Sequence, residues 1–102
     1  MSILVIDDEV GLRRSICAYL EDMDYPTLEA GDGSRGLERL AAESAAVQAV
    51  IVDLNMPVMD GYSFIPQARE IAPETPIVVL SGVGVVEDAL RAIRLGAWDF
   101  IT

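Results

Sequence analysis

The chain has 102 residues and a formal net charge of −10, from 17 acidic residues against seven basic ones, all arginines. Because it contains no histidine and no lysine, the sequence excludes a Ser-His-Asp triad, a histidine-ligated zinc site, a P-loop and Schiff-base chemistry. The acidic balance argues against direct nucleic-acid binding, since phosphate contacts supply much of that affinity. A lone Cys17 and the lack of any apolar stretch near the roughly 18 residues of a membrane span predict one cytoplasmic, non-membrane domain.

Five short apolar segments predict β-strands. The segments at 3–6 (ILVI), 49–52 (AVIV) and 77–80 (IVVL) are continuous rather than alternating, which is typical of parallel strands covered on both faces. The segment at 27–30 (TLEA) contains a glutamate and follows a proline, so it predicts an edge strand. The segment at 98–101 (WDFI) predicts a fifth strand.

Four segments between these strands carry one apolar stripe each at helical spacing. The first predicted helix buries a stripe of four residues, namely Leu12, Ile16, Leu20 and Met23. Arg13 and Arg14 lie off that stripe, and we expect them to face solvent. Asp32 or Ser34 is expected to cap the second helix. Pro66 predicts a kink in the third helix or a later start, and Gly96 predicts the end of the fourth.

The strict alternation of strands and helices predicts an α/β fold with an open, doubly wound parallel sheet. Right-handed crossovers then place helices on both faces of this sheet. In such folds, ligands bind beyond the carboxyl ends of the strands. The residues that end each strand are therefore the candidates for a functional site.

Acidic residues follow two of the predicted strands. Asp7 and Asp8 come directly after the first strand, and Asp53 comes after the third. If these strands are neighbours, the carboxylates crowd one edge and repel each other unless protons, water or a cation relieve the charge. Few carboxylates with room for retained water favour Mg²⁺ as that cation. The alternative is that Asp7 and Asp8 cap the helix that follows.

Four segments together resemble a response-regulator receiver domain: 3–9 (ILVIDDE), 53–61 (DLNMPVMDG), 79–82 (VLSG) and 96–101 (GAWDFI). They occur in the family's order and at its spacing along the whole chain. The resemblance implies a flavodoxin-like sheet of strand order 2-1-3-4-5. It also implies a cytoplasmic phosphoprotein of two-component signalling that is not itself an enzyme.

The resemblance implies that Asp53 takes a phosphoryl group from the phosphohistidine of a sensor histidine kinase, forming an aspartyl phosphate. It implies Mg²⁺ bound by the side chains of Asp8 and Asp53 and by the backbone carbonyl of Asn55. Asp7 would act mainly by orienting a metal-bound water. Phosphoryl transfer depends mostly on this positioning and charge neutralisation.

Two further residues carry the predicted response to phosphorylation. By the resemblance, Ser81 hydrogen-bonds a phosphoryl oxygen, and Phe100 corresponds to the family's switch aromatic. The resulting conformational change would act on an output domain in a longer parent chain, and any contact with DNA would belong to that domain.

The sequence departs from the family after its fifth strand, where receivers carry a lysine and then a fifth helix. This chain ends at Thr102, so we expect a receiver domain over residues 1–102 that is truncated at its C-terminus and lacks that helix. Without the lysine, we expect poor phosphorylation or a failure to switch. Apolar surface left beside the fourth and fifth strands predicts a dimer or strand exchange through that side.

Two alternative functions stay open at this point. One is a receiver-like protein-interaction module that is never phosphorylated. The other is a phosphatase of the haloacid-dehalogenase type, which also forms a phosphoaspartate. That family needs a second acid two residues after its nucleophile, where this chain has Asn55, and a lysine, which this chain lacks.

Overall fold

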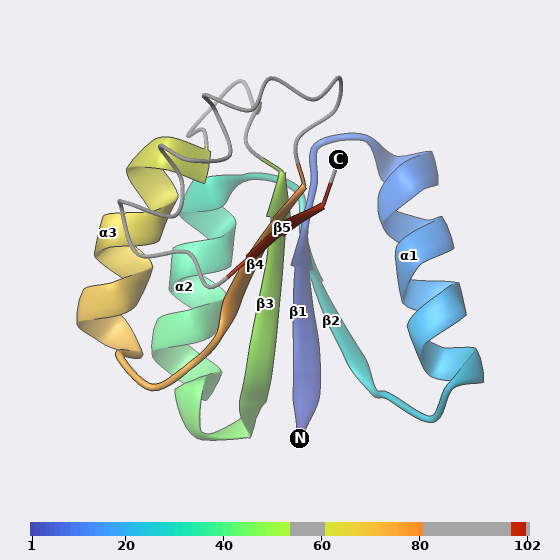
Figure 1. Ribbon diagram of the computed structural model, residues 1–102, viewed down its shortest axis with the longest axis horizontal. Coiled ribbons are helices and arrows are strands. Elements are labelled where there is room, and N and C mark those ends of the chain that lie inside the picture. Colours follow the sequence, from blue (N-terminus) through green and yellow to red (C-terminus); the bar gives the residue numbers. More distant parts are fainter. Residues whose placement is uncertain (54–60, 81–98, 102) are drawn as a thin grey trace.

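The computed structural model describes residues 1–53, 61–80 and 99–101, which form one parallel sheet flanked by helices (Figure 1). The strands are β1 (Ser2–Ile6), β2 (Thr27–Ala30), β3 (Val47–Asp53), β4 (Ile77–Leu80) and β5 (Asp99–Ile101). The helices are α1 (Val10–Asp22), α2 (Gly33–Glu43) and α3 (Gly61–Ile71), with a short 3₁₀ turn at Ser44–Ala46. The strand order β2-β1-β3-β4-β5 confirms the predicted doubly wound fold.

The helices divide between the two faces of the sheet. Figure 1 shows α2 and α3 on one face and α1 on the other. Leu4 and Ile6 of β1 belong to the core under α2 and α3, whereas Ile3 and Val5 pack with Cys17 of α1. A strand with both faces covered must be apolar at every position, which accounts for its continuous apolar pattern. Cys17 is a buried, packed side chain, and burial raises the pKa of its thiol.

The buried face of α1 differs from the predicted stripe. Ile16 and Leu20 do pack against the sheet, but Leu12 is 44% exposed and Met23 is 54% exposed. The buried face is instead centred on Cys17, and it includes Arg13, whose side chain is only 14% exposed. The expectation that Arg13 faces solvent is therefore wrong, because a charged side chain is buried when it finds polar partners.

The helix ends are set by local chemistry that the sequence showed in part. Asp32 caps α2 as predicted, since its Oδ1 accepts a hydrogen bond of 2.8 Å from the backbone N–H of Arg35. A residue at positive φ, Asp24, ends α1 with the paired reverse hydrogen bonds of a Schellman motif. The helix α3 runs through Pro66 from Gly61 onward, so the expected later start is wrong. The predicted fourth helix and Trp98 lie outside the described residues.

The helix α2 approaches the end of β1 at a glycine, and this close contact leads to a stability prediction. A Cβ on Gly36 would overlap the side chain of Ile6, meeting Cγ1 at 3.0 Å, and would lie 3.2 Å from Cε1 of Phe64. Both neighbours are fully buried, so neither side chain has room to move away. We expect Gly36→Ala to lower the free energy of unfolding by about 1 kcal/mol in urea titrations, because overpacking exceeds the gain in helix propensity.

The matched control is the same substitution at Gly11 in α1, where nothing lies within 4 Å of the added Cβ. Only the helix propensity changes there, so Gly11→Ala should stabilise the protein by about 0.5 kcal/mol. Equal stabilisation by both substitutions would contradict the packing of α2 on Ile6.

The α1 face of the sheet also carries an apolar groove of about 380 Å³, lined by Ser15, Ile16, Tyr19, Leu20, Ile51 and Leu80. Within the described ranges, α1 is the only helix on this face (Figure 1). The groove lies between α1 and the strands β3 and β4, and the association expected through the side of β4 and β5 stays a prediction. Among the described residues, no helix is both long and apolar enough to cross a membrane.

Candidate functional site

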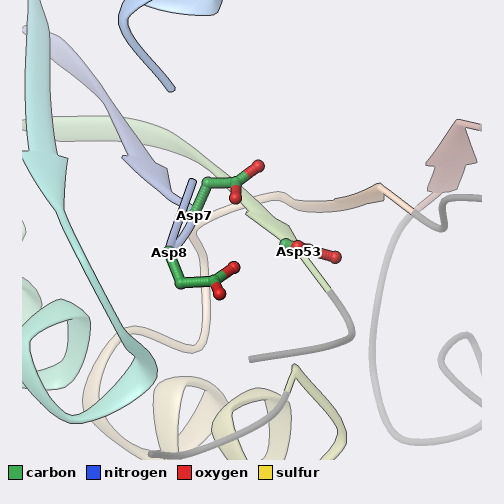
Figure 2. A group of neighbouring side chains, drawn as sticks. All are labelled: Asp7, Asp8 and Asp53. Atoms are coloured by element: carbon green, nitrogen blue, oxygen red, sulfur yellow. The ribbon is translucent and has the colours of Figure 1, made fainter. Parts of the chain in front are cut away.

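Three carboxylates converge where β1 and β3 end. The two strands are neighbours, with Ile6 paired to Val52, so Asp7 and Asp53 follow side by side in the same register. One carboxylate oxygen from each of Asp7, Asp8 and Asp53 lies within 4.8 Å of the others. Figure 2 shows the three side chains directed to the same side of these chain segments. The structure thus confirms the predicted neighbourhood of the two strand ends.

Asp7 is the buried member of this cluster, at 1% exposure. Its Oδ1 accepts a hydrogen bond of 2.9 Å from the backbone N–H of Glu9, while its buried Oδ2 has no hydrogen-bond partner among the described residues. Burial raises the pKa of the Asp7 carboxyl, and the negative charges of Asp8 and Glu9 add to this effect, against the opposing hydrogen bond from Glu9.

The alternative that Asp7 and Asp8 serve as helix caps does not fit the structure. Glu9 occupies the N-cap position of α1, and its own side chain makes no capping hydrogen bond. Asp7 accepts from Glu9, which precedes the first residue of α1, Val10. Neither aspartate therefore caps the N-terminus of α1.

The arrangement suits a small hard cation. Two carboxylates about 5 Å apart repel by about 3 kcal/mol at an effective dielectric of about 20. A divalent cation would remove that repulsion and give the buried Oδ2 of Asp7 a positive group to face. Asp8 is exposed and Asp53 is half-buried, so the cluster stays open to solvent on one side. Carboxylate oxygens plus retained water are the ligands that Mg²⁺ prefers. The residues present therefore fit Mg²⁺.

The other predicted site residues are only partly covered by the structure. Asn55 and Ser81 lie outside the described residues, although Leu80, which precedes Ser81, pairs with Asp53 across β3 and β4. Phe100 lies in β5 beside Val79 of β4, and its role as a switch aromatic stays a prediction.

Comparison with known proteins identifies the family. The family model described as the response regulator receiver domain matches residues 3–102. The chain belongs to the response-regulator receiver domain family. A putative NtrX-like response regulator of Rickettsia bellii is 34% identical over 99% of this chain and 21% of its own length. The receiver domain assignment agrees with the four motifs and with the observed strand order.

Solved structures of receiver domains superpose on nearly the whole chain. The receiver domain of NtrX from Brucella abortus is 35% identical with a TM-score of 0.88, covering 98% of this chain and 83% of that one. A response regulator from Burkholderia pseudomallei, solved with a phosphorylated aspartic acid, a calcium ion and citrate, is 27% identical with a TM-score of 0.89. That match covers 97% of this chain and 57% of that one.

This receiver domain spans between about a fifth and two-fifths of the length of the curated relatives it matches. The activities of those longer proteins are therefore properties of the relatives and are not assigned to this chain.

Proposed function

We propose that this receiver domain accepts a phosphoryl group on Asp53, with Mg²⁺ held by the surrounding carboxylates. The observation that carries the proposal is the convergence of Asp7, Asp8 and Asp53, together with a buried Asp7 oxygen that lacks a partner among the described residues. Asp8 and Asp53 would bind the ion directly, Asp7 would orient a bound water, and the backbone carbonyl of Asn55 would complete the protein ligands. Bound Mg²⁺ would supply positive charge that offsets the charge on the incoming phosphoryl group.

The proposed reaction requires little covalent chemistry from the protein. A carboxylate oxygen of Asp53 forms the new O–P bond while the N–P bond of a phosphohistidine breaks, and the imidazole leaves with the bonding electrons. Asp53 is the last residue of β3 and is half-buried. Its carboxylate therefore lies at the carboxyl end of the central strand, where a phosphodonor would reach it. Ser81 would then hydrogen-bond a phosphoryl oxygen, and Phe100 would report the change.

The proposed partners follow from the family. A sensor histidine kinase would donate the phosphoryl group, and an output domain in a longer parent chain would respond to it. The relatives include a probable transcriptional regulator about two and a half times as long as the matched segment, and a transcriptional regulatory protein several times as long. The length of these relatives supports such a parent. We also propose a cytoplasmic location. A dimer or strand exchange through the side of β4 and β5 remains a proposal, and the apolar groove beside α1 reaches that side only at Leu80 of β4.

The decisive experiment is incubation of the chain with Mg²⁺ and acetyl phosphate, a small phosphodonor, followed by intact mass measurement. We expect a gain of about 80 Da in part of the protein, because no lysine is present to pair with the phosphoryl group. The gain should disappear in Asp53→Asn and when Mg²⁺ is removed by a chelator.

Asp32→Asn provides the matched control, since Asp32 caps α2 and lies outside the carboxylate cluster. This variant should gain mass as the wild type does. If saturating donor gives no mass gain in the wild type, the unphosphorylated interaction module becomes the better description.

A further inference from the structure

Arg13 is buried to a degree that is unusual for an arginine. It lies in the first turn of α1, one turn after the aspartates, and its side chain is 14% exposed. The next residue, Arg14, is 70% exposed and is the ordinary case. Removing a charged side chain from water costs considerable free energy unless its N–H groups find acceptors. The acceptors that Arg13 contacts must therefore offset this cost.

The guanidinium of Arg13 connects β2 with Asp7, the aspartate that directly follows β1. Its Nε donates a hydrogen bond of 2.9 Å to Oε1 of Glu29 in β2. Its Nη1 donates a second hydrogen bond of 2.9 Å to the backbone carbonyl of Asp7. A planar guanidinium presents such donors in a fixed fork, so the two acceptors constrain each other's position.

The peptide groups of Asp7 are therefore held from both sides. The backbone N–H of Asp7 donates to the carbonyl of Ala30 at 3.2 Å, and its carbonyl accepts from Arg13. Both anchors lead back to β2, because Ala30 and Glu29 belong to that strand. The backbone of Asp7 is fixed by these bonds, and its Oδ1 is held by the N–H of Glu9. The orientation of the carboxylate, and with it the position of Oδ2, is therefore also fixed.

We infer that Arg13, held by Glu29, is a positioning residue of the carboxylate site, which sets how tightly the three aspartates bind Mg²⁺. This inference rests on the proposed function, because it assigns Arg13 a task at that metal site. Arg13 touches the backbone of Asp7 and would not touch the ion. Groups that orient metal ligands in this way typically change metal affinity by about 10- to 100-fold when they are removed.

A purely structural role for Arg13 makes a different prediction. If the ion pair only fixed α1 to the sheet, its loss would lower the stability of the protein but leave the affinity of the folded state for Mg²⁺ unchanged. Metal affinity of the folded protein, measured by calorimetric titration with MgCl₂ alone, separates the two roles. Near-ultraviolet circular dichroism verifies that each variant is folded at the temperature of the titration.

We expect Arg13→Gln to weaken Mg²⁺ binding by about tenfold, the lower end of the range, because the contact is with backbone. Glu29→Gln should weaken binding severalfold, since Glu29 holds the guanidinium in place. It also keeps the inference testable if Arg13→Gln fails to fold. The double variant should bind no more weakly than Arg13→Gln alone, because the two residues act as one unit.

Arg14→Gln is the matched control. This substitution removes the same charge from the adjacent position. Nε of Arg14 lies 3.6 Å from the same oxygen of Glu29, but the Arg14 side chain is exposed. Its Mg²⁺ affinity should stay within about twofold of the wild type. If Glu29→Gln and Arg13→Gln also stay within twofold, the inference is overturned while the metal site stands. If the wild type itself binds no Mg²⁺, the proposed function fails and the inference fails with it.

Discussion

Replacing Asp7 by asparagine is expected to stabilise the metal-free protein by about 1–3 kcal/mol and to weaken Mg²⁺ binding by at least about tenfold. The buried Oδ2 of Asp7 has no hydrogen-bond partner among the described residues, and the Asp7 carboxylate lies beside the carboxylates of Asp8 and Asp53. Asparagine keeps the oxygen that accepts from Glu9, and it replaces the unpartnered, charged Oδ2 with a neutral amide nitrogen that can donate a hydrogen bond.

The two measurements are urea unfolding in chelator and calorimetric titration with MgCl₂. A gain in stability with a loss of affinity would show that the site sacrifices stability for metal binding, as functional sites often do. Asp32→Asn is again the control, because asparagine caps a helix as well as aspartate does. It should change neither quantity appreciably. A less stable Asp7→Asn protein would contradict the view that Asp7 is under electrostatic strain.

The strands could be predicted from the sequence because they depend on short-range pattern, and the acidic site followed from the strand ends once the order of the strands was assumed. A strand buried on both faces must be apolar throughout, and the segment of β1 shows this directly. The strand-end rule then places Asp7 and Asp53 together once β1 and β3 are neighbours. The metal-site hypothesis needed only this placement and the chemistry of carboxylates.

The orientation of α1 could not be predicted in the same way. A hydrophobic stripe treats Arg13 as a solvent-facing residue, whereas the structure buries it against Glu29, sixteen positions along the chain. Its burial depends on a partner that only the tertiary fold supplies. Gly36 is a similar case, since nothing in the residues around it shows that Ile6 lies against its Cα. Both residues act at the end of β1 and were missed because their contacts are non-local.

Magnesium is expected to change the sign of the contribution that Asp7 makes to the pH dependence of stability. Burial raises the pKa of Asp7 above its ordinary value of 3.8, so in metal-free solution the folded state binds the proton more tightly than the unfolded state. The contribution of Asp7 is then most favourable below pH 3.8, and it is lost as the pH rises from there through the raised pKa of the folded protein.

This contribution can be isolated by subtracting the wild type from Asp7→Asn at each pH, because the other carboxylates titrate in both proteins. The stability advantage of Asp7→Asn in chelator should therefore grow with pH across that window, by no more than about 1.4 kcal/mol per pH unit. Below the window, where Asp7 is protonated in both states, the advantage should nearly vanish.

Adding Mg²⁺ should reverse the trend, because the ion binds the deprotonated carboxylates of the folded state. At a Mg²⁺ concentration of about 100 times its dissociation constant, the wild type should gain about 2.7 kcal/mol above the window. Below the window, protons compete with the ion and the gain should shrink. Potassium chloride at the same ionic strength controls for simple screening of the repulsion. Equal stabilisation by the two salts would show that the carboxylates are relieved by screening alone, without a bound ion.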